Sequence, residues 1–514
     1  MSGSDGCTQP IESAAVDNSL INDVDKFVEK LLNDYKPQKI TEPKVIHDPI
    51  LGSNIFEPYE VALIDSPFVQ RLRRISQTDV ATLVYPSANS TRFEHTLGVT
   101  IIAGKIIDSL VRKITPETED ILSSPIARKE VRIAAILHDI GHGIFSHLSE
   151  DKVKRLPEVI SQFEQNPGKF SREKPHEMIS YLIVKSQTFK NYFEEYIEKK
   201  QGLGSGISLD RIANSIIPAG AKDERSGWQA QIINGPFDAD KFDYLQRDAY
   251  FSGLKIGIDL DRFLHCVWLD ISPGKPRQLK IRTSGATTLE QILFGKMLLY
   301  NTIYHHHKIL SAECAIKAIL ELSVKDKICG RNMNRAIDFL YITENDILSL
   351  DGKSEKLKVY ISRFLGRDLL KRALVISADT VNNPGISPGY QSFTKLAEYP
   401  EKRRETVDQL IKKLGDKYDR CDVWLEIPQT ITFEDALQAS IKDENDTARY
   451  YSDTFPVSGW LSAYSSNKWR GYVFCPAQKD IREEVGKEAA KLIEDEYGFK
   501  FDTVKALGQA KIRD

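Results

Sequence analysis

Apolar residues at helical spacing limit the fold of this chain more than any other feature. Between positions 97 and 113 they fall on one face of a helix, at Val99, Ile102, Ala103, Ile106, Ile107 and Leu110. Segments 129–137, 176–185 and 240–250 have the same period. Segment 289–322 has almost no glycine or proline, so it predicts the longest helix or helix pair. The chain is therefore predicted to be mainly α.

The pattern divides the 514 residues into three predicted parts. Residues 1–43 form an N-terminal extension, in which positions 24–32 predict a short amphipathic helix. Residues 44–330 form a helical domain, and residues 331–514 form a smaller α+β C-terminal domain. In that last part, segments 423–428 and 471–476 look like strands stopped by proline, and a charged amphipathic helix follows them.

Composition excludes several classes of function. The net charge of −3 leaves no electrostatic footprint for nucleic acid or an anionic membrane, so we expect neither partner. No apolar run approaches the length that spans a bilayer, and the N-terminus has no signal pattern. The six cysteines are scattered without a CxxC pair, which favours a reducing, cytoplasmic location.

Histidine and aspartate concentrate in three short segments. His95 lies in the run RFEHTLG, His138 begins the run HDIGHGIFSH, and Asp240 lies in DADKFDY. A single histidine is usually a core residue with a hydrogen-bond partner. An adjacent His138–Asp139 pair beside glycines and two further histidines favours a divalent metal site that activates water.

The positions of these residues make chemical sense. His138 and Asp139 would end one helix, His95 would come from a partner helix and Asp240 from a third, which leaves coordination positions open for catalysis. Imidazole and carboxylate suit Fe, Mn, Co, Ni and Zn alike. Nearby residues are then available for proton transfer, phosphate contacts or a second metal, namely His142, His147, His176 and Glu177.

The ordered string RLRRISQ, FEHTLGV, HDIGHGIFSH and DADKFDYLQRD resembles the HD-domain phosphohydrolases, most closely the deoxynucleoside triphosphate triphosphohydrolase branch. The similarity covers roughly residues 44–320 and implies an HD-domain helical core. It implies metal ligands at His95, His138, Asp139 and Asp240, and catalytic groups at His142, His147, His176 and Glu177. It implies substrate contacts at Arg92, Gln77, Lys241, Tyr244, Asp248, His307 and Lys308. It also implies a homo-oligomer, a tetramer or hexamer.

Several of these residues have structural alternatives. Tyr244 could belong to the core, and Arg92 could form an ion pair with Glu94 or Asp240. A second resemblance concerns a regulatory nucleotide between subunits, and it involves Lys44, Val45, Asp65, Gln70 and Arg73. Caps and surface ion pairs would explain these five residues equally well.

The expected function is hydrolysis of a deoxynucleoside triphosphate to deoxynucleoside and inorganic triphosphate, with Mg²⁺ on the substrate phosphates as a second metal. Metal-activated water would attack the α-phosphorus and a histidine would protonate the leaving oxygen. The chain departs from the family at Met297, Asn301 and His305. A nucleotidase or phosphodiesterase is therefore an alternative, and a nucleotide-binding module with a structural metal is another.

Overall fold

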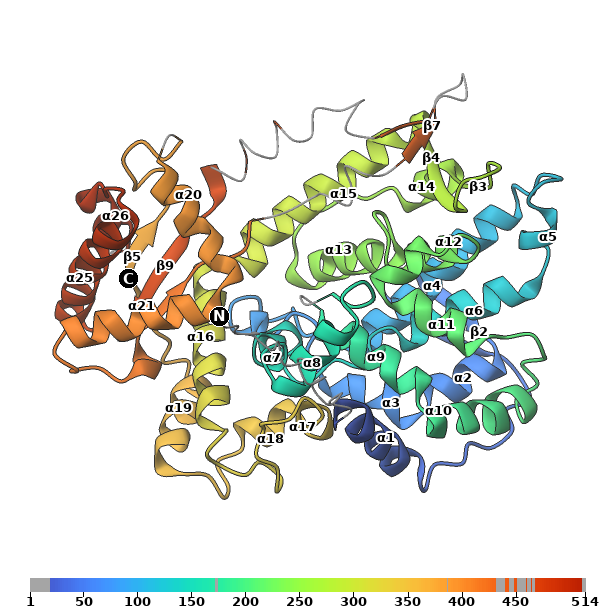
Figure 1. Ribbon diagram of the computed structural model, residues 1–514, viewed down its shortest axis with the longest axis horizontal. Coiled ribbons are helices and arrows are strands. Elements are labelled where there is room, and N and C mark those ends of the chain that lie inside the picture. Colours follow the sequence, from blue (N-terminus) through green and yellow to red (C-terminus); the bar gives the residue numbers. More distant parts are fainter. Residues whose placement is uncertain are drawn as a thin grey trace, which may run out of the picture.

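A computed structural model describes residues 19–171, 174–385, 387–430, 440–442, 448–450, 459, 464 and 467–510. Figure 1 shows its helical body and, at one side, a smaller lobe that contains the C-terminal sheet. The predicted N-terminal extension lies outside the described residues up to position 18. From there, α1 (Ser19–Leu32) forms the predicted amphipathic helix and buries Leu20, Val24, Phe27 and Val28.

The α-helices up to residue 266 are α1, α2 (Pro58–Ile64), α3 (Pro67–Gln70), α4 (Arg92–Val111), α5 (Glu119–Leu122), α6 (Pro125–Leu137), α7 (Ser146–Val153), α8 (Pro157–Gln165), α9 (Pro175–Lys185), α10 (Gln187–Tyr192), α11 (Leu209–Ile216), α12 (Gly227–Ile233), α13 (Ala239–Ser252) and α14 (Leu260–Cys266). Those after it are α15 (Ala286–Leu299), α16 (His307–Leu322), α17 (Asp338–Tyr341), α18 (Glu344–Leu348), α19 (Glu355–Leu365), α20 (Pro388–Thr394), α21 (Pro400–Lys413), α25 (Lys479–Tyr497) and α26 (Thr503–Ala510).

Helix α4 is the centre of the helical body. It packs against α6 and α13, and its apolar residues at helical spacing are almost fully buried. Thr91 caps its start: Thr91 and Glu94 form a capping box, which satisfies backbone N–H groups of the first turn. The three helices that hold the predicted metal ligands are therefore neighbours around one core.

The strands form three small sheets. The hairpin of β1 (Lys44–Asp48) and β2 (Gly52–Phe56) pairs Lys44 with Phe56. A second sheet has the order β3 (Val267–Asp270), β4 (Gln278–Arg282), β7 (Ser440–Lys442), β8 (Ala448–Tyr450), with β4 and β7 parallel. The C-terminal sheet has the order β5 (Lys371–Ile376), β9 (Gly471–Cys475), β6 (Trp424–Glu426) and is antiparallel. Helices α21, α25 and α26 pack on it.

The predicted fold class, a mainly α chain with an α+β C-terminal part, is confirmed. Segment 289–322 is a helix pair, in which a π-helical turn at Tyr300–Tyr304 separates α15 from α16. The longest helix of the described residues is nevertheless α4, because its period continues from Arg92 without a break. Within the same residues, no helix combines the length and the hydrophobicity that crossing a membrane requires.

Candidate metal centre and active site

The predicted metal ligands converge from three helices. His95 comes from the first turn of α4, His138 and Asp139 follow the last turn of α6, and Asp240 lies in the first turn of α13. One ligand atom of each of His95, His138 and Asp139 lies within 4.8 Å of the others. Asp240 Oδ1 lies 3.1 Å from His95 Nε2. The geometry therefore brings together the four predicted ligands.

Both histidines use Nδ1 outside the centre, which turns Nε2 toward it. His95 Nδ1 bonds Asp243 Oδ2 at 2.8 Å, and His138 Nδ1 donates to the carbonyl of Ala135 at 2.7 Å. Buried His138 Nε2 makes no hydrogen bond to any residue that the structure describes. A histidine that is fixed through its other ring nitrogen is the usual metal-ligand arrangement, so these residues fit a divalent metal.

A carboxylate and a guanidinium support His95 from behind. Asp243 accepts hydrogen bonds from Arg247 Nε and Nη2, both at 2.8 Å, and Arg247 Nη2 also reaches Asp48 at 2.8 Å. All three side chains are buried. Gly98 makes the approach possible, because a Cβ there would lie 1.8 Å from Asp243 Oδ1. The orientation of His95 thus depends on residues far apart in sequence.

Charge at the centre favours a cation. Burial lowers the pKa of His95, but Asp240 and Asp243 outweigh burial and raise that pKa to about 10. Burial raises the pKa of Asp139, but His138, Arg92 and His95 together hold it far below its usual range. A divalent metal would take the place of the proton between these histidines and carboxylates.

A second cluster of histidines surrounds Glu150 on α7. This carboxylate pairs with His176 Nδ1 through one oxygen and with His147 Nδ1 at 2.8 Å through the other. The His142 ring stacks on His176 with centroids 3.8 Å apart. Burial lowers the pKa of His176, while Glu150 more than compensates and raises it. Burial and nearby cations lower the pKa of His142 well below normal, so this ring is neutral.

Arg92 connects the two clusters. Its Nη1 donates to Asp139 at 2.9 Å, its Nε donates to Ser146 Oγ at 2.9 Å, and its Nη2 lies 3.2 Å from His147 Nε2. The expected alternative partners, Glu94 and Asp240, are therefore not the groups it pairs with. A guanidinium between a metal ligand and an exposed histidine is placed to meet a phosphate oxygen.

The loop that follows Asp139 is strained and is held from several sides. Phe145 and Ser146 both have positive φ values, 50° and 38°. Ile144 N donates to the carbonyl of Phe339 at 3.4 Å, and Phe145 N donates to Glu344 at 3.1 Å. Because α17 and α18 contribute these acceptors, contacts that shape the loop cross the predicted domain boundary at residue 330.

Arg71 anchors the same loop from the other side. Its side chain donates to the carbonyls of Ile140 at 3.0 Å, His142, and Leu340 at 3.2 Å. These three bonds make Arg71 an architectural residue of the site. The same loop packs closely on α9 at Gly141, where the Cβ of any other residue would lie 2.2 Å from the carbonyl oxygen of His176.

Two predicted substrate residues present buried, unsatisfied oxygens. Asp248 receives a hydrogen bond from Tyr304 at Oδ2, whereas its Oδ1 has no partner among the described residues. Gln77 Oε1 is also buried without a described partner. Burial raises the pKa of Asp248 to about 6. Tyr244 is half-buried. Phe242 packs in the core against Phe263, with ring centroids 4.4 Å apart.

Other predicted contacts already have protein partners. Lys241 Nζ bonds Asp238 at 2.7 Å and the carbonyl of Gly235 at 2.8 Å. Glu177 pairs with Lys174 at 2.7 Å and with Asn234 at 2.9 Å, so Glu150 and not Glu177 links the histidines. The roles predicted for Lys241 and Glu177 stay predictions.

The junction of α15 and α16 differs from the rest of the site. Met297 is buried in the core, and Asn301 donates to its carbonyl and to the hydroxyl of Tyr464, both at 2.9 Å. His307 lies against Tyr472 of β9, with ring centroids 6.4 Å apart, and Lys308 is exposed. These residues contact the C-terminal part, and a substrate contact there stays a prediction.

The five residues of the predicted regulatory site lie close together at the surface. Lys44 pairs with Asp65 at 3.7 Å, and Gln70 accepts from Arg73 at 2.9 Å. The Arg73 guanidinium also covers the Phe93 ring at 3.5 Å, and Val45 is 67% exposed. The described contacts are compatible with both interpretations, surface ion pairs and a nucleotide site.

Sequence reasoning missed three supporting residues. They are Asp243, Glu150 and Tyr304, none of which the sequence pattern predicts as a site residue. Two of them carried a signal in the sequence. Asp243 follows the predicted metal ligand Asp240 by three positions, and Glu150 follows the predicted catalytic residue His147 by three positions, which is about one helical turn. Tyr304 carried none, since the π-helical turn that positions it breaks the α-helical period.

Comparison with known proteins agrees with this geometry. Residues 92–248 match the HD domain family, and residues 258–496 match the HD associated region. The chain therefore contains an HD domain, and its similarity points to the deoxynucleoside triphosphate triphosphohydrolase branch. The family assignment explains why the pair that gives the domain its name, His138–Asp139, lies at the centre of the site.

Individual relatives are similar over part of the chain. An uncharacterized protein of Methanocaldococcus jannaschii is 30% identical over 59% of this chain and 56% of its own length. The human deoxynucleoside triphosphate triphosphohydrolase SAMHD1 is 32% identical over 43% of this chain and 35% of its own length. The chain thus covers about half or less of these relatives. A crystal structure of a hypothetical protein from Aquifex aeolicus shares the fold, with a TM-score of 0.58, 22% identity, and coverage of 87% of this chain and 100% of its own.

Proposed function

We propose that this protein is a metal-dependent phosphohydrolase that converts a deoxynucleoside triphosphate to deoxynucleoside and inorganic triphosphate. One observation carries the proposal. An oriented His/Asp centre, at His95, His138, Asp139 and Asp240, lies beside a carboxylate-linked histidine pair, at His147 and His176. A structural metal would not need the second cluster, whereas hydrolysis needs a proton donor beside the metal.

The residues of the two clusters would have distinct roles in the reaction. A divalent metal at this centre would supply the Lewis acidity that makes water a nucleophile at neutral pH. Arg92 would stabilise negative charge on the phosphates from its position between Asp139 and His147. Glu150 raises the pKa of His176 and so favours its protonated form, and His147, whose side chain is 61% exposed, would protonate the leaving 5′-oxygen.

The unsatisfied oxygens of Gln77 and Asp248 support a substrate with a sugar hydroxyl. A buried acceptor without a donor costs about 1–3 kcal/mol, which a bound hydroxyl would recover. Tyr304 fixes the Asp248 carboxyl, so its free oxygen points in one direction. This is the arrangement that discriminates strongly between substrates with and without that hydroxyl.

A nucleotidase or phosphodiesterase on the same centre is the second candidate. Met297 is buried and Asn301 is engaged by Tyr464, so the helix junction offers the triphosphate fewer free groups than the family pattern implies. Under this alternative, the same metal and histidines would release orthophosphate from a monophosphate.

Regulation and assembly are part of the proposal. SAMHD1 relatives support a nucleotide substrate. We extend the proposal to a homo-oligomer, a tetramer or hexamer, with a nucleotide activator at Lys44, Val45, Asp65, Gln70 and Arg73. The exposed Val45 and Ile55 on the β1–β2 hairpin are compatible with burial between subunits.

Chromatographic product analysis tests the activity. The protein is incubated with an equimolar mixture of deoxynucleoside triphosphates and Mn²⁺, beside the variant Asp139→Asn. Nucleoside and triphosphate from the wild type alone would support the proposal. Turnover of monophosphates with triphosphates inert would select the second candidate, and no turnover of any nucleotide under several metals would contradict both.

A further inference from the structure

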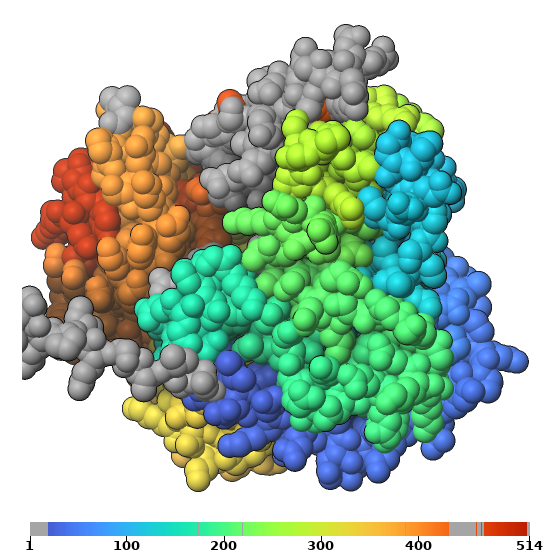
Figure 2. Space-filling view, turned by 45° about the vertical axis from the view of Figure 1, so that its right-hand side comes forward, coloured from blue at the N-terminus to red at the C-terminus, as the bar shows by residue number. Residues whose placement is uncertain are grey.

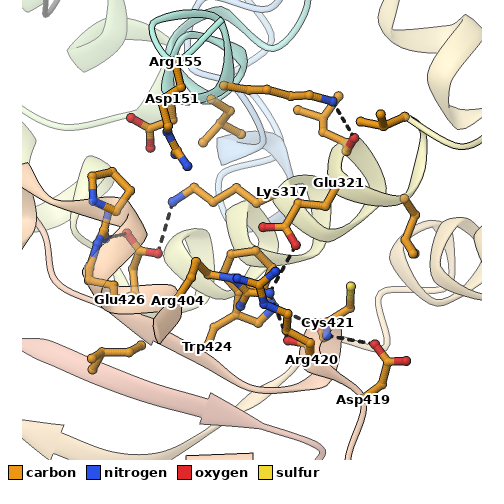
Figure 3. Close-up of a pocket in the computed structure, with 18 of the residues that line it drawn as sticks. Asp151, Arg155, Lys317, Glu321, Arg404, Asp419, Arg420, Cys421, Trp424 and Glu426 are labelled. Atoms are coloured by element: carbon orange, nitrogen blue, oxygen red, sulfur yellow. Dashed lines mark hydrogen bonds and ion pairs between the residues drawn. The ribbon is translucent and has the colours of Figure 1, made fainter. Parts of the chain in front are cut away.

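A cavity of about 600 Å³ lies on the side of α7 away from the histidines. Its walls come from α7, α16, α21 and β6, so it lies between the helical body and the C-terminal part (Figure 3). None of the metal ligands or clustered histidines lines it. Its volume is in the range of pockets that enclose a small ligand.

The lining of this cavity is strongly cationic. Eight lysine and arginine side chains face it, against four carboxylates. The cations are Lys152, Arg155, Lys317, Lys325, Lys356, Arg403, Arg404 and Arg420. Since the whole chain has a net charge of −3, this concentration of positive charge is a local feature of the cavity and not a consequence of composition.

The carboxylates neutralise only part of that charge. Glu426 is shared by Lys317 at 3.1 Å and Arg403 at 3.0 Å. Glu321 pairs with Arg404 at 3.1 Å. Desolvation raises the pKa of buried Glu426, but Lys317 and Arg403 overcome it and lower that pKa, as expected where cations are in excess.

Three cations have no carboxylate partner in the part of the chain that the structure describes. Arg155 and Lys325 are exposed at the cavity, and their side chains make no described hydrogen bond or ion pair. Lys152 donates only to the carbonyl of Leu320, at 2.9 Å. Figure 3 shows that the Arg155 and Lys317 side chains point toward one another from α7 and α16, and that Lys317 is paired with Glu426. The donors of Arg155 and Lys325 are available to an anion.

Apolar side chains also line the cavity. Leu148, Leu320, Leu425 and Trp424 are among them, and the Arg404 guanidinium lies 4.0 Å from the centroid of the Trp424 ring. Arg403 and Arg404 are more than nine-tenths buried, and each has an Nε–H that bonds no described residue. A ligand that fits this lining carries an anionic group together with an apolar or planar part.

We propose that this cavity binds a phosphorylated small molecule of nucleotide size, at a site separate from the metal centre. Phosphate oxygens contact Arg155, Lys317 and Lys325, and the apolar part of the ligand lies against Trp424. Helix α7 connects the two sites, because Asp151 and Lys152 line the cavity while His147 and Glu150 of the same helix form the histidine cluster. A ligand in the cavity is therefore expected to affect the position of those histidines through α7.

Isothermal titration with inorganic triphosphate tests the proposal in the full-length protein. The variant His138→Ala disables the metal centre and should still bind triphosphate within about twofold of the wild-type affinity. Adding Arg155→Glu and Lys325→Glu to that variant should weaken binding about tenfold or more, because two attractive charges become repulsive. The matched control is Lys487→Glu, an exposed lysine on α25, which should change the affinity less than about twofold.

Each result decides the matter. Failure of the His138→Ala variant to bind triphosphate would place the anion at the metal centre only and overturn the proposal. Binding that survives the two charge reversals would overturn it as well. Because Arg155 and Lys325 are exposed, the variants should fold, and Arg155→Gln with Lys325→Gln gives a milder second test. Binding does not require turnover, so these outcomes are independent of the proposed hydrolysis.

Discussion

The metal centre and the cationic cavity lie on opposite sides of α7 and are built on different principles. At the centre, carboxylates orient the histidines, as Asp243 orients His95 and Glu150 orients His176. In the cavity, Arg155 and Lys325 have no such partner among the residues that the structure describes. Polar groups that are already fixed in position suit catalysis, because they need not reorganise in the transition state. Lysine and arginine side chains without a carboxylate partner suit the binding of an anionic ligand, which provides the missing negative charge.

The largest expected effect is at the metal centre. Asp139→Ala removes a ligand and the partner of Arg92, so the hydrolysis rate should fall by about 10³-fold or more. Metal content, measured by mass spectrometry, should fall with it. The control is Asp108→Ala on α4, a surface ion pair with Arg128, which should leave both quantities unchanged. Full metal content in Asp139→Ala would contradict the assigned centre.

Glu313 on α16, beside the cavity, is expected to make the stability of the protein depend on pH. Burial raises its pKa to about 7, and Lys317, Glu426 and Asp151 of the cavity also act on it. The unfolded chain ionises near pH 4.5, so this group costs stability increasingly between about pH 4.5 and 7, up to about 3 kcal/mol. Glu313→Gln should remove that part of the decline in melting temperature as pH rises.

The control for this measurement is Glu355→Gln, because the Glu355 side chain is 89% exposed. Its melting temperature should follow the wild-type pH dependence. A Glu313→Gln variant that loses stability between pH 5 and 7 as steeply as the wild type would show that this carboxyl ionises normally.

Glu150→Gln should separate proton transfer from metal binding. Without the carboxylate, the pKa of His176 falls, so a rate that needs this protonated ring should lose about 10- to 100-fold. The alkaline limb of the pH–rate profile, where the protonated ring is lost, should move to lower pH, while metal content is unchanged. A merely structural role would lower the rate at all pH values without moving the profile.

The smallest expected effect on the hydrolysis rate comes from substitutions in the cavity when no ligand is bound there. Arg155→Glu with Lys325→Glu changes no group of the metal centre, so the basal hydrolysis rate should stay within about twofold of wild type. Initial-rate assays without added triphosphate measure it. A loss of more than about tenfold would mean that the two regions are one site.

The sequence predicted the helices and the metal ligands because both leave local signals. The apolar period of α4 and the adjacent pair His138–Asp139 are visible within a few residues. Residues 24–32 and 471–476 likewise form the predicted helix and strand.

What could not be predicted depends on contacts between distant segments. Arg247 reaches Asp48 across the core, and Glu426 of β6 meets Lys317 of α16, so neither pair has a spacing that a pattern could reveal. The cavity is likewise absent from any single segment, because its charge comes from several elements that lie far apart in the sequence.

The contacts of Phe339, Leu340 and Glu344 with the catalytic loop set a practical limit on dissecting this protein. A chain cut after residue 330 would keep every proposed metal ligand, yet Arg71 and Phe145 would each lose an acceptor. We expect such a fragment to fold with a loosened loop. A fragment meant to retain these loop contacts must extend at least through α18, to Leu348.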